Sequence, residues 1–384
     1  MNQTVSKNYI LPKIKRNFLP QNLCVDSWNN LEPFFKNLNE RKINSWQELE
    51  KWLFDKSELE AFLEEDLAWR YIKMSCDTSN TELKKSFSFF TSEIEPKASI
   101  YLNDFDKKLL SADIIKFIDE KKYHIYLRRI KKKTEIFREE NLPLFTQLHA
   151  EQQKYRACTA AMTVNMNGIE ITMQKAYDSF RNPDRKIRED MYRLLKERKS
   201  KDTTFLNNLF TELIKLRNKV AHHAGFDNFR DYTFASLARF DYNFQDCYDH
   251  HQAVASEIVP LTRSFDEIRK KNMKVDVLMP WDTDVDTSGR AAIVPFKTSE
   301  ELIDKTIECF YRLNPFYGDC IRSMKAMGHL DLDSRKGKAP GGFNYPLYES
   351  GAPFIYMNSV GSVRDLVTMM HEGGHAIHSF LIKD

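Results

Sequence analysis

The sequence SVRDLVTMMHEGGHAIHSFL, residues 362–381, decides how the rest of the chain is interpreted. Its apolar residues recur at steps of three and four, which is the spacing of one face of an α-helix. The predicted apolar face consists of Val363, Leu366, Val367, Met370, Gly374, Ile377 and Leu381. Ser362 is the predicted N-cap, and Asp365 stands where the acid of a capping box is expected. The stretch is therefore predicted to form one amphipathic helix.

Two histidines stand one helical turn apart in this stretch. Because His371 and His375 are four positions apart, their imidazoles point the same way and can bind one metal ion. With Glu372 they form the pattern H-E-x-x-H, in which the histidines hold zinc and the glutamate acts as a general base. The sequence therefore predicts one zinc ion on His371 and His375, with Glu372 as the catalytic residue. The competing interpretation is a helix with merely polar surface histidines, because so short a pattern also matches by chance.

Three stretches before the helix are predicted to be strands that face it. Residues 331–333 and 341–348 are two of them, and residues 352–358 form the third, followed by a turn at Gly361. We expect the third to be an exposed edge strand that holds a substrate backbone beside the ion by β-augmentation. Gly341–Gly342 either lets a peptide backbone approach closely or forms a simple turn. The predicted substrate-binding residues are Gly341, Gly342, Phe354, Ile355, Tyr356 and Met357.

The H-E-x-x-H pattern occurs together with other recognisable motifs. HEGGHAIH (371–378), PFIYMN (353–358) and RKGKAPGGF (335–343) resemble the oligoendopeptidase F enzymes of the thimet oligopeptidase family of zinc metallopeptidases. Three further stretches resemble the same family: AGFDNFRDY (224–232), RFDY (239–242) and PWD (280–282). The resemblance is specific from about residue 160 to the end. It implies an almost wholly helical enzyme with a deep channel, which cleaves short peptides with the help of one zinc ion.

The ligand set of the predicted zinc site is incomplete. A hydrolytic zinc needs three protein ligands and an open position. In H-E-x-x-H-x-x-G-x-x-H enzymes the third ligand would stand at position 381, with glycine at 378, but Leu381 and His378 stand there and exclude that class. The resemblance implies a glutamate ligand from a following helix, with an oxyanion-stabilising tyrosine and histidine further on. We therefore expect these residues beyond Asp384, so that the chain is the N-terminal part of a longer peptidase or a truncated gene product.

Helical patterns fill most of the remaining chain. Residues 162–172 are the exception, because Asn167-Gly168 between apolar and β-branched residues is the strongest short-range hairpin signal. We predict an N-terminal helical lobe at residues 1–141 and a catalytic oligopeptidase domain at residues 142–384, incomplete at its C-terminus. With the resemblance, the expected fold is mainly α, a zincin-like helical oligopeptidase with a small β-sheet beside the metal helix.

The composition is that of an ordinary globular chain. Its 384 residues are enough for two or three domains, and 42% of them are hydrophobic. The net charge of +3 indicates a soluble surface and argues against a dedicated nucleic-acid binder. The six cysteines form no C-x-x-C pair, which is typical of a reducing compartment: Cys24, Cys76, Cys158, Cys247, Cys309 and Cys320. Residues 1–20 lack the apolar run of a signal peptide, and no stretch approaches transmembrane length. We expect a cytoplasmic protein that binds short peptides, but neither nucleic acid nor a membrane.

Three functions remain open on the sequence. The first is a zinc endopeptidase in which Glu372 activates a zinc-bound water and peptide bonds of short oligopeptides are hydrolysed. The second is a zinc aminopeptidase, but the related aminopeptidases carry an acidic residue on the strand before the metal helix, and residues 352–358 contain none. The third is a catalytically incompetent helical scaffold that binds peptides. His378, one turn beyond His375, is interpreted as an ordinary polar residue and not as a ligand.

Overall fold

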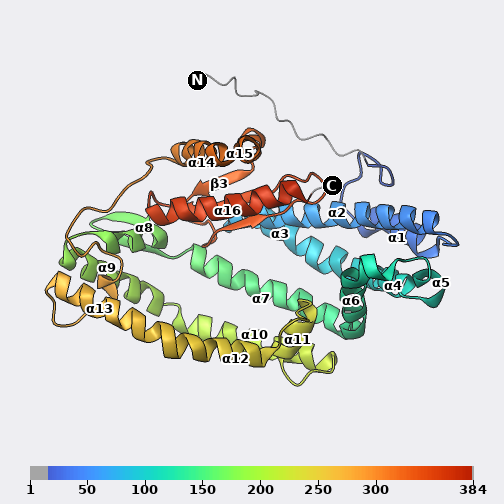
Figure 1. Ribbon diagram of the computed structural model, residues 1–384, viewed down its shortest axis with the longest axis horizontal. Coiled ribbons are helices and arrows are strands. Elements are labelled where there is room, and N and C mark those ends of the chain that lie inside the picture. The colour runs from blue at the N-terminus through green and yellow to red at the C-terminus, as the bar shows by residue number, and fades with distance from the viewer. Residues whose placement is uncertain (1–15, 383–384) are drawn as a thin grey trace.

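The computed structural model describes residues 16–382, and helices dominate them (Figure 1). The first helices form an N-terminal group: α1 (Trp28–Glu40), α2 (Trp46–Cys76), α3 (Thr81–Phe89), the π-helical turn η1 (Phe90–Ile94), α4 (Glu95–Leu109), α5 (Ala112–Ile115) and α6 (Glu120–Ile136). Phe35, Trp52 and Phe105 are fully buried among them, and the Trp52 indole donates a 2.8 Å hydrogen bond to the carbonyl of Leu38. This group of helices therefore has a hydrophobic core of its own.

The middle of the chain is a second series of helices with one hairpin near its start. The helices are η2 (Glu139–Asn141), α7 (Leu142–Ala160), α8 (Met173–Asp178), η3 (Ser179–Arg181), α9 (Arg185–Ser200), α10 (Thr203–His223), α11 (Phe229–Ser236), α12 (Phe244–Ala253), η4 (Val254–Ile258), α13 (Val259–Met273) and η5 (Pro280–Asp282). The hairpin pairs β1 (Thr163–Met166) with β2 (Ile169–Thr172). Its turn residues Asn167 and Gly168 have φ values of 54° and 85°, as the tight hairpin turn requires. The predicted hairpin is confirmed.

The C-terminal part combines three helices with a small sheet. Its elements are α14 (Ser299–Leu313), α15 (Pro315–Met327), β3 (Leu330–Asp333), β4 (Phe343–Tyr345), β5 (Phe354–Ser359) and α16 (Val363–Leu381). The strand order is β3-β5-β4, with β3 parallel and β4 antiparallel to β5. Helix α16, the H-E-x-x-H helix, lies against this sheet and packs on α14 and α15 (Figure 1). The predicted fold, mainly α with a small sheet beside this helix, is confirmed.

The predicted apolar face of α16 is wrong in its register. Val367 and Leu381 are 61% and 59% exposed, although the spacing predicts both on the buried side. The buried residues of the helix are Asp365, Met369, Gly373, Ala376, Ile377 and Phe380. Steps of three and four residues fit two adjacent faces of this helix, and the predicted face includes Gly374 where the structure buries Gly373. In the fold, Gly373 is buried because the ring of Phe310 from α14 packs directly on its backbone.

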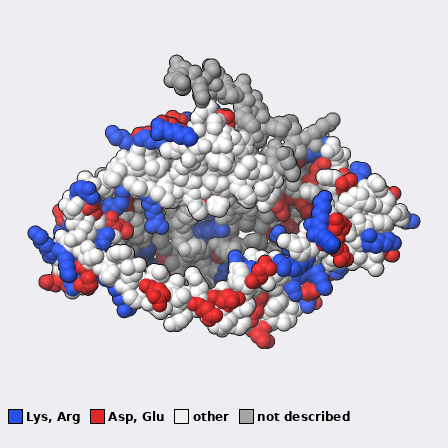
Figure 2. Space-filling model, viewed as in Figure 1, with Lys and Arg blue, Asp and Glu red and all other residues white. Residues whose placement is uncertain are grey.

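Two parts of the molecule face each other across a hollow. The part with α14, α15, α16 and the sheet lies above, and α7, α10 and α12 run below it (Figure 1). The space-filling view shows the surface hollowed between these parts (Figure 2). Helix α7 begins at Leu142, immediately after the predicted domain boundary, but the division into two domains stays a prediction.

Candidate active site

The start of α16 is held in place by the predicted capping box. The Ser362 hydroxyl accepts a 3.0 Å hydrogen bond from the Asp365 backbone N–H, and the Asp365 carboxylate accepts one of 2.8 Å from the Ser362 N–H. The same carboxylate accepts a 2.9 Å hydrogen bond from the N–H of Val360, in the loop after β5. The N–H groups at the start of a helix have no acceptor within the helix, and the box supplies acceptors for those of Ser362 and Asp365. The bond from Val360 ties this first turn of α16 to the end of the sheet. The cap prediction is confirmed.

His371 and His375 meet on the exposed side of α16. Their Nε2 atoms are 3.1 Å apart, with ring centroids at 4.7 Å and planes at 87°. Zinc–nitrogen bonds of about 2.0–2.1 Å at a tetrahedral angle separate two nitrogen ligands by about 3.3 Å, so the pair fits the coordination of one ion. With no ion, the same distance suits a hydrogen bond in which one imidazole N–H donates to the other nitrogen. The structure therefore brings the two predicted ligands together at a distance that suits zinc.

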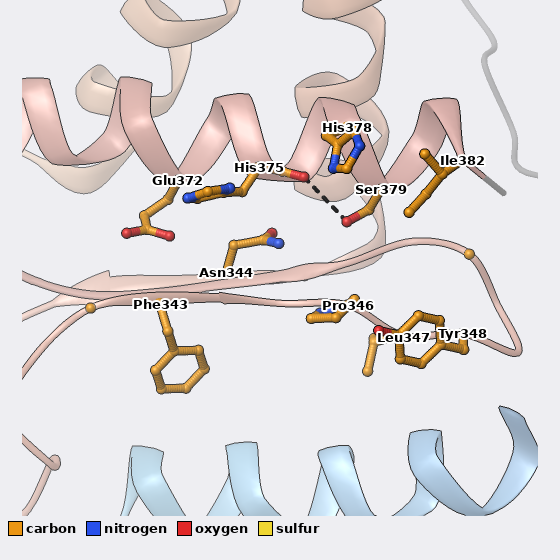
Figure 3. Close-up of a pocket in the computed structure, with 12 residues that line it drawn as sticks. Phe343, Asn344, Pro346, Leu347, Tyr348, Glu372, His375, His378, Ser379 and Ile382 are labelled. Carbon is orange, nitrogen blue, oxygen red and sulfur yellow. Dashed lines mark hydrogen bonds between the residues drawn. The ribbon is translucent and has the colours of Figure 1, made fainter. Parts of the chain in front are cut away.

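A cavity of 640 Å³ lies between α16 and the segment around β4 (Figure 3). Helix α16 contributes Glu372, His375, His378 and Ser379 to its lining, together with Ile382 just after the helix, and the opposite wall is Gly342, Phe343, Asn344, Pro346, Leu347, Tyr348 and Gly351. Figure 3 shows Glu372 pointing from the helix toward β4. The cavity is large enough for part of a peptide, and the glutamate of the H-E-x-x-H pattern faces its interior.

The predicted edge position of residues 352–358 is wrong. Strand β5 pairs with β3 on one side and with β4 on the other, and Phe354, Ile355, Tyr356 and Met357 are buried. A backbone whose groups are paired on both sides cannot add a substrate as a further strand. The segment contains a continuous apolar run, which is typical of a central strand that is covered on both faces. Among the described residues β4 has one strand partner, so β4 is the edge nearer the cavity.

The two positions before β4 require glycine for different structural reasons. Gly341 has a φ of +105°, so the turn itself requires a residue without a side chain. A Cβ at Gly342 would lie 3.3 Å from the Tyr356 carbonyl oxygen, which means that the neighbouring strand approaches closely there. Both glycines are exposed, and Gly342 lines the cavity.

A buried lysine anchors the loop that carries these glycines. Lys338 is 3% exposed, and its ammonium donates hydrogen bonds to the carbonyls of Asp331 and Asp333 at 3.0 and 2.9 Å and to that of Met357. Burial raises the pKa of the Asp331 carboxyl, but hydrogen bonds from Arg335 and Lys338 outweigh it and hold that pKa below its usual range. The loop is therefore fixed to β3 and β5 by charge-assisted hydrogen bonds.

Sequence reasoning missed Asn344. Its side chain points from β4 toward α16, between Glu372 and Ser379, whereas Phe343 points the opposite way (Figure 3). The Oδ1 atom of Asn344 is buried and has no hydrogen-bond partner among residues 16–382. Alternation along a strand would have placed residue 344 on the helix side, once the strand itself was assigned. Asn344 is therefore a further candidate functional residue.

No third metal ligand joins the histidine pair within residues 16–382. In this part of the chain, no group of three or more His, Cys, Asp or Glu side chains is arranged to hold a metal ion. His378 is exposed and lines the cavity, one turn along α16. The described residues therefore supply the two histidines and Glu372, and no complete ligand set.

Comparisons with known proteins agree with this arrangement. The model of Peptidase family M3 matches residues 180–384, and that of the Peptidase M3 N-terminal domain matches residues 23–137. An oligoendopeptidase F homolog of Borreliella burgdorferi is 27% identical over 320 residues, which are 79% of this chain and 50% of that protein. Oligopeptidase PepF of Bacillus subtilis is 26% identical over 136 residues, 35% of this chain and 20% of that protein. The chain thus matches half the length of the first of these relatives and a smaller part of the second.

Solved structures share the fold. A putative oligoendopeptidase F from Bacillus anthracis superposes with a TM-score of 0.87 at 20% identity, covering 100% of this chain and 68% of that chain. Pz peptidase A with an inhibitor gives a TM-score of 0.86 at 22% identity, covering 91% of this chain and 62% of that chain. At these identities the superpositions show a common fold.

Proposed function

Because the chain belongs to peptidase family M3, we propose that it carries the metal-binding helix and part of the substrate cleft of a zinc metalloendopeptidase that hydrolyses short oligopeptides. The observation that carries this proposal is the pair of imidazole nitrogens 3.1 Å apart on α16, beside a cavity that Glu372 faces. The two nitrogens suit one zinc ion, and the cavity suits a peptide.

The residues of α16 have distinct proposed roles. His371 and His375 would hold the zinc through their Nε2 atoms. When bound, zinc polarises a carbonyl and lowers the pKa of a bound water. Glu372 takes the proton of the attacking water and gives it to the leaving amine, because its carboxylate lies on the cavity side of the same helical turn.

The proposed place for the substrate backbone is the edge of β4, instead of the predicted β5. Strand β4 has a strand partner on one side, and Gly342 and Asn344 line the cavity that Glu372 faces. A peptide that lies along this edge can exchange main-chain hydrogen bonds with β4 and present a peptide bond to the helix. The exposed Gly341 and Gly342 leave its path free of side chains.

A peptide-binding role without hydrolysis is the second candidate. It is favoured by one observation, namely that residues 16–382 hold no third His, Cys, Asp or Glu grouped with the pair. Two histidines leave the coordination of a zinc ion to be completed from outside these residues.

The two candidates are separated by hydrolysis of an N-acetylated, internally quenched peptide in the presence of zinc. In a protein that includes the third zinc ligand, we expect Glu372→Gln to reduce the rate by about 10²–10⁴-fold, because proton transfer is lost, while zinc still binds. Glu257→Gln, which changes an exposed glutamate in η4, is the matched control and should keep the rate. An unchanged rate in Glu372→Gln would refute the general-base role, and peptide binding without any cleavage by a wild-type protein that includes the third zinc ligand would favour the scaffold.

We propose further that the protein works in the cytoplasm. The cysteines support this proposal, since all six are free thiols in the structure. No helix within residues 16–382 has the length and apolar character needed to cross a membrane.

A further inference from the structure

A second cavity, of 330 Å³, adjoins the candidate active site and lies between the two parts of the molecule that face each other across the hollow. Its walls come from α2, α7, α10, β5 and the loop before β4, and its thirteen described lining residues include Tyr71, Ser75, Arg156, Arg217, Gly342 and Phe343. Gly342 and Phe343 also line the first cavity. Among these described lining residues there are two guanidinium groups and no carboxylate. Figure 2 shows basic side chains on the walls of the hollow.

Arg156 of α7 is held by an aromatic ring rather than by an acid. Its guanidinium lies over the ring of Tyr71, 4.5 Å from the centroid. Tyr71 in turn contacts Phe343 of β4, with ring centroids 5.7 Å apart. A guanidinium stacked on a ring keeps its N–H edges free for a planar acceptor. Arg156 is therefore oriented beside the β4 segment without its hydrogen-bonding capacity being used.

Arg217 of α10 also has its guanidinium near an aromatic ring and not beside an acid. It is half-buried, and its guanidinium lies 5.7 Å from the ring centroid of Phe229. Within residues 16–382, neither this guanidinium nor that of Arg156 has an ion pair or hydrogen bond. On α9, the preceding helix in the chain, Arg188 by contrast pairs with Asp282 at 2.8 Å. Two half-buried cations without a counter-charge in one cavity attract an anion.

We infer that Arg156 and Arg217 bind a carboxylate group of the peptide substrate. This inference rests on the proposed function, because it assumes that a peptide lies along β4 past Gly342, where the two cavities share their wall. A guanidinium matches a carboxylate with two parallel N–H···O hydrogen bonds, which makes the pairing strong and directional. The Ser75 hydroxyl also lines the cavity, is buried and has no partner within residues 16–382, so a bound acceptor would satisfy it. The carboxylate is either the C-terminal one or that of an Asp or Glu side chain.

Calorimetric binding of three short N-acetylated, alanine-rich peptides to the 384-residue chain distinguishes the two sources. The first peptide ends in a free carboxylate, the second in an amide, and the third is the amide with one internal glutamate. We expect a carboxylate to tighten binding by roughly tenfold over the plain amide, as charge-assisted hydrogen bonds do. A gain for the first peptide assigns the C-terminal carboxylate, and a gain for the third alone assigns an acidic side chain. Equal binding of all three would overturn the inference.

Substitutions then test the two arginines. Arg156→Gln and Arg217→Gln should each abolish most of the difference between acid and amide, and Arg217→Lys should keep part of it because the charge remains. Lys219→Gln is the charge-matched control, because Lys219 is exposed and lies about 200° around α10 from Arg217. An undiminished acid preference in both glutamine variants would overturn the assignment. Hydrolysis by wild type and by Glu372→Gln is read separately, so a failed carboxylate site and a failed peptidase proposal give different results.

Discussion

Replacing Gly373 with alanine should weaken the packing of the H-E-x-x-H helix, whereas the same change at Gly374 should stabilise the helix and leave its packing unchanged. A Cβ at Gly373 would lie 2.6 Å from Cε2 and 3.0 Å from Cζ of Phe310, and 3.6 Å from Cδ1 of Ile321. Phe310 is 6% exposed, so its ring cannot swing into solvent, and α16 or α14 must shift. A Cβ at Gly374 would meet nothing within 4 Å.

The magnitudes follow from two opposing effects. Alanine is favoured over glycine in a helix interior by about 1 kcal/mol, and this gain applies to both positions. Overpacking a core costs about 1–3 kcal/mol, and this cost applies to Gly373 alone. Gly374→Ala should therefore be about 1 kcal/mol more stable than wild type. Gly373→Ala should be less stable than Gly374→Ala by about 1–3 kcal/mol.

Equilibrium unfolding in urea, followed by far-UV circular dichroism, measures the difference. The midpoints of the two variants should separate while the slope with urea concentration stays the same, since neither change alters the surface exposed on unfolding. Because helix propensity is common to both variants, the comparison isolates the contact with Phe310. Equal stabilisation by both alanines would refute the packing described for α16.

Two further predictions concern carboxyl groups that the fold withdraws from water, the buried Asp282 and the half-buried Glu95. Burial raises the pKa of Asp282, but hydrogen bonds from Arg185 and Arg188 outweigh it and hold this pKa at about 2. Asp282→Asn leaves the buried Arg188 without a counter-charge, so it should lower the free energy of unfolding at pH 7 by about 3 kcal/mol, with exposed Asp284→Asn as the control. In wild type this stabilisation should disappear as the pH falls from 3.8 toward 2, and equal urea midpoints of the two variants at pH 7 would contradict the prediction. Burial raises the pKa of Glu95 from 4.5 to about 7, so the folded chain keeps a proton that the unfolded chain releases. The stability of wild type relative to Glu95→Gln should therefore fall as the pH rises from 4.5 to 7, and a difference that is constant with pH would argue against it.

Local signals in the sequence predicted most of the elements around the site. The capping box at Ser362, the hairpin turn at Asn167-Gly168 and the three strands before α16 depend on neighbouring residues, and all are present. The H-E-x-x-H spacing also places His371 and His375 side by side, since four residues make about one helical turn.

Features that depend on distant partners could not be predicted in the same way. Whether a strand lies at the edge or the centre is decided by which segments pair with it, and β5 acquires β3 and β4 on its two sides. The buried face of α16 depends on Phe310, which is 63 positions before Gly373 (373 − 310). Similarly, Arg156 and Arg217 have no motif spacing, and only the packing of α7 beside α10 places them in one cavity.

Zinc binding by the histidine pair tests the central claim most directly. Zinc is titrated against a chromophoric chelator in wild type and in His371→Ala, His375→Ala and His378→Ala. The proposed site predicts one zinc ion per chain, lost in either of the first two variants and retained in the third, because His371 and His375 have the paired nitrogens. Zinc bound with wild-type affinity by both His371→Ala and His375→Ala would contradict the claim that α16 is the metal helix of a peptidase.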